Sequence, residues 1–296
     1  MTRCGLVAVI GAPNAGKSTL VNALVGQKVA ITSAKAQTTR ARMLGIALEG
    51  DTQMILVDTP GIFSPKRKLD RAMVSAAWEG TESADVVLLM VDPVKQRRHE
   101  LEPLLEALEK RPEKKILVLN KVDVAKKEPL LALAQELTAK VDFGEVFFVS
   151  AMTGDGIPEM KAALASKMPE AEWMYPEDQV SDASERLLAT EITREQLYRQ
   201  LHEELPYDSA VRPELYKHRP DGSLEIHQQI VVTRPNQRAI VLGKGGSRIK
   251  AIGEAARLEL TEVLGVKVHL FLHVKVEENW SEDREVFEEI GLEWTK

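Results

Sequence analysis

Short apolar runs alternate with longer amphipathic segments through the first half of the chain. Continuous apolar runs are typical of parallel strands buried on both faces, and strand–helix alternation is typical of α/β folds. The pattern therefore predicts a mostly parallel sheet with helices on both sides. The expected strands are Leu6–Ile10, Met54–Asp58, Val86–Val91, Ile116–Asn120 and Val146–Val149, with an antiparallel edge strand at Arg42–Leu48. The expected helices are Lys17–Val25, Leu69–Thr81, His99–Glu109, Pro129–Lys140 and Pro158–Lys167.

The pattern changes near Pro169. Met168–Asp182 contains two prolines, several acidic residues and little periodicity, which indicates a linker. We therefore expect a first domain at 1–168, a linker at 169–183 and a second, α+β domain at 184–296. The elements expected in the second domain are a helix at Ser184–Glu204, strands at Ser209–Lys217 and Glu225–Thr233, helices near Gln237–Leu242 and at Ser247–Leu264, a strand at Val266–Val276, and an acidic final helix at Glu277–Glu293 packed through Phe287, Ile290 and Trp294.

Composition limits the class of protein. Of 296 residues, 44% are hydrophobic and 28% charged, which allows two separate cores. The single cysteine, Cys4, excludes an intramolecular disulfide. Neither a charged-then-apolar leader nor a run of about 18 apolar residues is found. We expect a monomeric, cytoplasmic protein, with a peripheral contact to the inner face of the cell membrane left open.

The net charge of −6 hides a basic segment. Residues 225–276 hold eight Lys or Arg and four Asp or Glu, a net charge of +4, whereas residues 277–296 carry −6. An acidic average therefore does not exclude a nucleic-acid partner for the second domain.

A phosphate-binding motif follows the first strand and opens the first helix. It matches G-x-x-x-x-G-K-[ST] at every position, and its glycines allow backbone N–H groups to wrap a phosphate at a helix N-terminus. Lys17 would neutralise the β- and γ-phosphates, and Ser18 would ligate Mg²⁺. The residues expected to bind nucleotide here are Gly11, Ala12, Pro13, Asn14, Ala15, Gly16, Lys17, Ser18 and Thr19.

A second motif, Asp58-Thr59-Pro60-Gly61, follows the strand Met54–Val57. An acidic side chain at that strand end can hold Mg²⁺ directly or through water. The backbone N–H of Gly61 could bond the γ-phosphate, so that the next loop senses its presence. Alone, such a turn is weak evidence.

A third motif, Asn120-Lys121-Val122-Asp123, selects the base. The Asp123 carboxylate can accept two hydrogen bonds from guanine N1–H and N2–H₂, whereas adenine would leave it unpaired; polar sites of this kind discriminate by roughly 10⁴-fold. Asn120 would support the loop, and the Lys121 stem would cover the ring. A last element, Ser150-Ala151-Met152, would place backbone N–H groups near guanine O6.

These elements occur in order at the carboxyl ends of predicted strands, where open α/β sheets bind ligands. Their joint placement predicts a GTP-binding and GTP-hydrolysing enzyme. An ATP-dependent enzyme is a weaker alternative.

With these motifs assembled, the sequence resembles the translation-factor-related GTPases, and within them the Era family, over nearly the whole chain. Gln37-Thr38-Thr39-Arg40 resembles the family's first switch motif. The resemblance implies that one threonine ligates Mg²⁺ in the GTP state, and leaves Thr38 and Thr39 both open. Lys17, Thr39, Gly61 and Asn14 are the expected catalytic group.

Ile62 stands where Ras-like proteins carry a water-orienting glutamine, so slow intrinsic hydrolysis is expected. In related GTPases an asparagine at the position of Asn14 ligates K⁺, which implies that K⁺ accelerates hydrolysis here. The alternative is that Asn14 only braces the loop.

A G-x-x-G turn lies between two helices of the basic segment. Such a turn lets single-stranded RNA approach closely, and its neighbours supply cations. The residues are Gly243, Lys244, Gly245, Gly246, Arg248 and Lys250. Ile230, Val232, Ile240 and Val241 could line a groove for bases, although most should be core.

The α-β-β-α-α-β order matches a type II KH domain. We therefore expect a Ras-like α/β P-loop GTPase domain followed by an α+β KH domain. The Era resemblance implies binding to the 3′ end of 16S ribosomal RNA and a role in maturation of the 30S ribosomal subunit. The alternative is a GTPase whose second domain docks a protein or a membrane.

Overall fold

The computed structural model describes residues 1–33, 35, 38–40, 43–62, 68–79, 81, 83–95, 98–202 and 205–284. Gln37 of the switch motif and Phe287, Ile290 and Trp294 of the expected final helix lie outside the described residues. Within the described acidic segment, a short 3₁₀ helix (η2) spans Trp280–Glu282. The chain divides into two compact units, which are described separately below.

The first unit contains a six-stranded sheet of order β2-β3-β1-β4-β5-β6. All its pairings are parallel except that of β2 with β3, so the expected antiparallel edge strand is confirmed. The strands are β1 (Arg3–Gly11), β2 (Met43–Glu49), β3 (Thr52–Asp58), β4 (Val86–Val91), β5 (Lys114–Leu119) and β6 (Glu145–Phe148).

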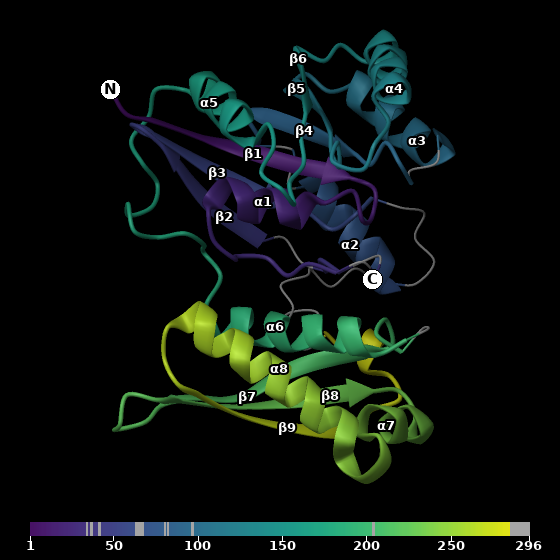
Figure 1. Cartoon of the computed structure of the whole chain (residues 1–296), viewed down its shortest axis with the longest axis vertical. Coiled ribbons are helices and arrows are strands. Elements are labelled where there is room, and N and C mark those ends of the chain that lie inside the picture. The colour runs from purple at the N-terminus through teal and green to yellow at the C-terminus, as the bar shows by residue number, and fades with distance from the viewer. Residues whose placement is uncertain are drawn as a thin grey trace. The chain divides into compact units, whose positions relative to one another are not determined.

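The helices described in the first unit cover its sheet (Figure 1). Alternate β1 residues face opposite cores: Val7 and Val9 pack with α1 and α5, whereas Ala8 and Ile10 pack with α3 and α4, and Trp78 of α2 joins that side. The sheet is thus buried on both faces, as its continuous apolar strands predict. The helices are α1 (Lys17–Val25), α2 (Lys68–Glu79), α3 (Arg98–Glu109), α4 (Lys127–Lys140) and α5 (Ile157–Lys167).

The segment expected to be a linker is attached to the first unit as far as Asp182. Gln53 of β3 is fully buried and accepts the backbone N–H groups of Met174 and Tyr175, at 2.9 and 3.0 Å. Near its end, Ile46 of β2 donates its N–H to the Val180 carbonyl at 2.8 Å. The low periodicity of the segment therefore reflects an irregular conformation. Hydrogen bonds from its backbone groups to β2 and β3 hold it in place, and such bonds leave no periodic pattern in the sequence.

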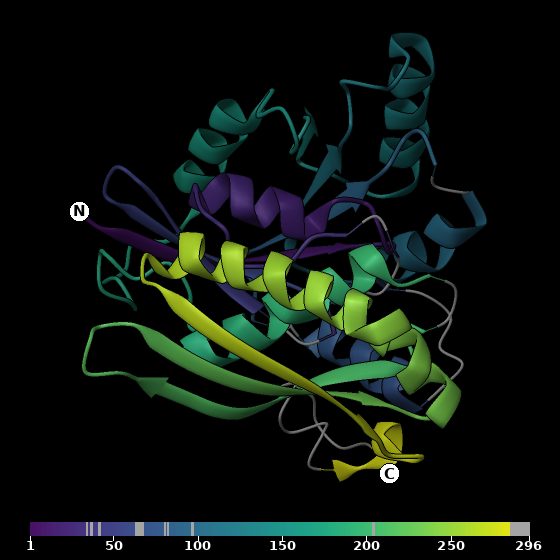
Figure 2. The same ribbon diagram turned by 60° about the horizontal axis from the view of Figure 1, so that its bottom comes forward.

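The second unit contains a three-stranded sheet of order β7-β8-β9, with β7 antiparallel and β9 parallel to β8. Side chains of α6, α7 and α8 form two apolar clusters on one face of this sheet. Figure 2 shows α8 in yellow-green running along the yellow strand β9. The elements are α6 (Glu185–Gln200), β7 (Ser209–His218), β8 (Leu224–Val232), α7 (Pro235–Leu242), η1 (Lys244–Gly246), α8 (Ser247–Leu264) and β9 (Val268–Val276).

The first helix of this unit is shorter than predicted. The Ser184 side chain caps its start by accepting the Leu187 N–H at 3.2 Å, as expected for a serine at that position. The helix ends at Gln200 rather than Glu204, because Leu201 takes an extended conformation. None of the described helices combines the length and the hydrophobicity that a membrane span requires.

Candidate functional site

The turn from β1 to α1 requires glycine at both ends. Gly11 has φ +153° and Gly16 φ +102°, conformations that side chains rarely adopt. A Cβ atom at Gly11 would lie 2.4 Å from the Met90 carbonyl oxygen, and one at Gly16 2.3 Å from Asn120 Nδ2. The helix N-terminus carries no side-chain cap among the described residues. Its N–H groups therefore remain available to an anion.

Lys17 lies buried beneath this turn. Its ammonium group donates to the carbonyl oxygens of Gly11, at 3.2 Å, and Ala12, at 3.0 Å. Burial lowers the pKa of Lys17 to about 8, and the charge of Asp58 opposes the shift. A buried ammonium group next to open N–H groups favours a phosphate ligand, which would restore the charge balance lost on burial.

Three side-chain oxygens meet beside Lys17 and form a candidate metal site. Ser18 Oγ donates to Asp58 Oδ2 at 2.6 Å and lies 2.9 Å from Thr39 Oγ1, which is 3.4 Å from the same carboxylate oxygen. Asp58 Oδ1 is buried and has no hydrogen-bond partner among the described residues. Burial raises the pKa of Asp58 to about 6, against the effects of Ser18, Lys17 and Thr39. A buried carboxylate with one unpaired oxygen and hydroxyl neighbours fits a hard cation such as Mg²⁺.

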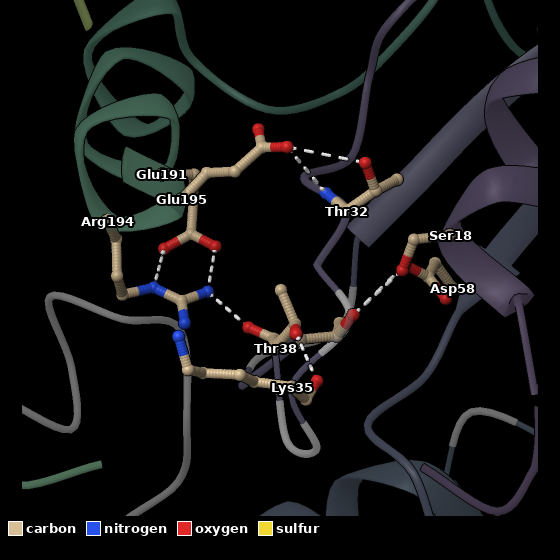
Figure 3. Close-up of polar contacts among 9 residues, drawn as sticks. Ser18, Thr32, Lys35, Thr38, Asp58, Glu191, Arg194 and Glu195 are labelled. Carbon is tan, nitrogen blue, oxygen red and sulfur yellow. Dashed lines mark hydrogen bonds and ion pairs between the residues drawn. The ribbon is translucent and has the colours of Figure 1, made fainter. Parts of the chain in front are cut away.

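The two candidate threonines occupy different positions. The Thr38 hydroxyl donates to the Lys35 carbonyl at 2.8 Å (Figure 3). The Thr39 hydroxyl instead joins Ser18 and Asp58. The geometry therefore favours Thr39 as the metal ligand.

Asn120 connects the phosphate side of the site with the base side. Its buried side chain donates to the Ala15 carbonyl at 2.9 Å and accepts the Ala151 N–H at 3.0 Å. Residues 105 and 31 positions apart are thereby joined through one amide. Asp123 is exposed, as is Met152, whereas Ser150 is buried. The carboxylate expected to read guanine is thus accessible.

Lys121 covers the same edge and brings in a residue that sequence reasoning missed. It has φ +63°, and its ammonium group donates to the Asn14 carbonyl at 3.0 Å and to Asp92 at 2.5 Å. Asp92 follows β4, at the carboxyl edge where the other motifs lie. Its position at the end of an apolar strand was the available signal.

The loop after Asp58 contacts the phosphate-binding turn. A Cβ atom at Gly61 would lie 2.8 Å from the Pro13 backbone, so only glycine fits without movement. The Ile62 N–H donates to the Gly11 carbonyl at 3.1 Å, and its aliphatic side chain packs beside the apolar core. Thr59 is buried and donates its hydroxyl to the Val9 carbonyl at 2.8 Å, which gives it a structural role.

In the second unit, the G-x-x-G turn is built on positive φ angles at Gly243, Gly245 and Gly246. A Cβ atom at Gly243 would lie 2.9 Å from the Arg248 backbone nitrogen, but Gly245 has open space around it. Lys244 and Lys250 are exposed, and Arg248 donates to the Ile240 carbonyl at 3.1 Å. The turn therefore presents its backbone and two lysines to solvent.

A groove of about 600 Å³ lies between α8 and β9. It is lined by Ile249, Lys250, Gly253, Glu254, Arg257, Leu270, Phe271 and Leu272. Of the residues considered for lining such a groove, Ile230, Val232 and Val241 are core, as mostly expected, and Ile240 is 45% exposed outside it. The sequence missed the β9 contribution, because periodicity along an edge strand does not show which of its residues border the preceding helix.

Comparison with known proteins agrees with this architecture. The family described as 50S ribosome-binding GTPase matches residues 6–121, and the KH domain family matches residues 204–281. The GTPase Era of Erythrobacter litoralis (strain HTCC2594) is 81% identical over 100% of this chain and 99% of its own length. The GTPase Era of Afipia carboxidovorans is 56% identical over 100% of this chain and 96% of its own.

Solved structures give the same result. An Era structure in complex with MgGDPNP and nucleotides 1506–1542 of 16S ribosomal RNA has a TM-score of 0.93 at 38% identity, covering 98% of this chain and 99% of that one. A tyrosine-to-alanine variant of Aquifex aeolicus Era bound to GDP·AlF₄⁻ has a TM-score of 0.92 at 38% identity, with the same coverage. The chain, with its P-loop GTPase fold and its KH fold, belongs to the Era family of GTPases.

Proposed function

We propose that the chain is a GTP-hydrolysing switch that binds the 3′ end of 16S ribosomal RNA and acts in assembly of the 30S subunit. The observation that carries the proposal is the meeting of Lys17, Ser18, Thr39 and Asp58 at the N-terminus of α1. This site combines a phosphate-binding turn, a buried cation and a set of oxygen ligands. Enzymes that transfer phosphoryl groups use the same combination.

Mg²⁺ would be held by Ser18, Thr39 and Asp58. When bound, the ion supplies positive charge to the phosphate oxygens and orients them. Lys17 would leave its loop carbonyls to reach the β- and γ-phosphates. The backbone N–H of Gly61 would donate to the γ-phosphate, and its contact with Pro13 keeps it close to the turn.

Specificity for guanine would come from Asp123, with Asn120 fixing the loops around the base. Thermal protection tests this assignment. GTP and GDP should raise the melting temperature of the chain, and ATP at equal concentration should not. Protection by ATP would instead support an ATP-dependent enzyme.

Hydrolysis would be slow without a further positive charge, because Ile62 carries no group that can orient water. We propose that K⁺, held through Asn14, supplies this charge. Asn14 is exposed at φ +65° on the phosphate-binding turn, a position from which its amide can face solvent and an ion. Electrostatic stabilisation of transferring phosphate is the route by which such a charge accelerates the reaction.

RNA would bind the second unit along the G-x-x-G turn and the groove beside it. The turn offers backbone and lysines to phosphates, while Leu270, Phe271 and Leu272 offer apolar surface to bases. An Era relative has been solved with nucleotides 1506–1542 of 16S ribosomal RNA, which supports the choice of RNA. Because the proposed ligand is ribosomal, we propose a cytoplasmic site of action.

Binding to a short single-stranded RNA with the 16S 3′-terminal sequence tests the RNA assignment. Affinity should fall as salt rises, and Gly245→Asp should weaken it at least about tenfold by placing a negative charge at the turn. The variant should fold, because Gly245 has open surroundings and aspartate tolerates positive φ better than most residues. If RNA affinity changes neither with salt nor with this substitution, the second domain instead docks a protein or a membrane. Cell fractionation would then show the chain with that partner.

A further inference from the structure

The segment between α1 and β2 changes units along its path. Residues Ile31–Thr38 group with the second unit, although the chain on both sides of them, through Ala30 and from Thr39, belongs to the first. Ile31 is buried in an apolar cluster with Ala189 and Ile192 of α6. Residues Ile31–Thr38 thus pack with the second unit, although they connect two elements of the first.

Hydrogen bonds attach the described residues of this segment to α6, and Figure 3 shows those of Thr32 with Glu195 and of Thr38 with Arg194. The Thr32 backbone N–H and hydroxyl both donate to Glu195 Oε1 at 3.3 Å. Lys35 donates its ammonium group to the carbonyls of Tyr198 and, at 2.6 Å, of Leu201, both at the end of the helix. Arg194 donates from Nη2 to the Thr38 carbonyl at 2.5 Å.

The Arg194 contact is held in place from several sides. The guanidinium pairs with Glu191, donating from Nε to Oε1 at 2.9 Å, and lies 5.3 Å from the centre of the Tyr198 ring. The side chain is buried, and its charge is retained because Glu191 offsets the effect of burial on its pKa. A buried, charge-assisted hydrogen bond to a carbonyl is stronger than an ordinary one.

The residue after Thr38 is the candidate metal ligand. Consecutive Cα atoms are about 3.8 Å apart, so a fixed Thr38 carbonyl restricts where the Thr39 hydroxyl can reach. In the structure that hydroxyl lies at Ser18 and Asp58. We propose that Arg194 of α6 is a positioning residue for GTP hydrolysis, which fixes Thr38 so that Thr39 can complete the metal site. The proposal rests on the proposed function, because it assumes that Thr39 ligates Mg²⁺.

Arg194→Ala in the full chain tests the proposal. The steady-state rate of GTP hydrolysis should fall about tenfold at limiting Mg²⁺, and the Mg²⁺ concentration for half-maximal rate should rise by a similar factor. GDP affinity should be unchanged, because contacts of a first switch threonine form with the γ-phosphate state and are released afterwards. A substitution that only damaged the fold would impair GDP binding together with the rate.

Arg186→Ala is the matched control. Arg186 lies on the same helix and also donates to carbonyls, those of Pro213 and Glu214, both at 3.3 Å. It has no hydrogen bond to the described residues of the Ile31–Thr38 segment. The hydrolysis rate and Mg²⁺ requirement of this variant should equal those of the unmodified chain.

Lys35→Ala removes another attachment of the Ile31–Thr38 segment to the end of α6. This variant replaces Arg194→Ala in the test if Arg194→Ala melts below the assay temperature.

A double-mutant cycle with Thr39→Ala decides whether Arg194 acts through Thr39. If it does, adding Arg194→Ala to Thr39→Ala should change the rate by less than about twofold. Fully multiplicative losses would overturn the proposal, as would equal rates for the Arg194 and Arg186 variants. Loss of activity in Thr39→Ala but not in Arg194→Ala would refute this inference alone, whereas an active Thr39→Ala would also refute the metal assignment.

Discussion

Asn120 joins the two halves of the nucleotide site, and its removal should lower nucleotide affinity beyond what the loss of stability explains. Asn120→Ala deletes the bond donated to the Ala15 carbonyl and the bond accepted from the Ala151 N–H. Both partners belong to residues that are less than a tenth exposed, so neither gains full access to water. A buried polar group left unpaired costs about 1–3 kcal/mol, so two such groups lower the free energy of unfolding by about 2–6 kcal/mol.

Nucleotide affinity should fall as well, because the phosphate turn and the Ser150–Met152 loop lose their common support. A loss of about 1.4 kcal/mol in binding free energy raises the dissociation constant tenfold. We expect the GDP dissociation constant to rise by at least about that factor. Urea unfolding of the nucleotide-free chain and calorimetric titration with GDP measure the two quantities independently.

Asn22→Ala is the matched control for this prediction. Asn22 of α1 also supports a loop, accepting the N–H groups of Val29 and Ala30, both at 2.9 Å, and donating to the Ala30 carbonyl at 2.8 Å. Its removal should cost similar stability and leave GDP binding within about twofold. If both variants lose stability and GDP affinity in the same proportion, the weaker binding is only a consequence of lost stability. Asn120 then has no separate role in joining the phosphate turn to the Ser150–Met152 loop.

Three further expectations concern the ion, the carboxylate and the groove. Asn14→Ala should abolish the difference between K⁺ and Na⁺ in hydrolysis rate; a retained K⁺ response would remove Asn14 from the ion site. The raised pKa of Asp58, about 6, means that the folded nucleotide-free chain binds a proton that the unfolded chain releases near pH 4. Stability should therefore fall by about 3 kcal/mol as pH rises from about 4 to 6, and Asp58→Asn should lack that component of the unfolding curve; parallel pH profiles of the two proteins would contradict it. Gly253 borders the groove, and a Cβ atom there would meet Leu272 only at ordinary contact distance, so Gly253→Leu should keep the melting temperature and lower RNA affinity, while unchanged affinity would move the RNA elsewhere.

The sequence could predict what depends on local order along the chain. Apolar runs such as Val86–Val91 are strands because their residues need burial on both sides, and this element has the predicted bounds. The helix Ser247–Leu264 does as well, because its apolar positions recur at helical spacing. The phosphate motif was recognisable because Gly11 and Gly16 must flank a turn whose geometry few other residues adopt.

Other features depend on residues that are distant in sequence, and only the tertiary structure decided them. Local pattern could not choose between Thr38 and Thr39, because adjacent hydroxyls are equivalent until the fold brings one of them to Ser18. Asp92 became part of the site only when β4 was placed beside β1 and β5. Likewise, the Arg194 contact joins residues 156 positions apart.

The sequence by itself thus determined the chemistry of the site, because backbone turns and ligand types are encoded within a few residues. The tertiary structure decided which of those groups act together, because hydrogen bonds and charges are felt only over a few ångströms.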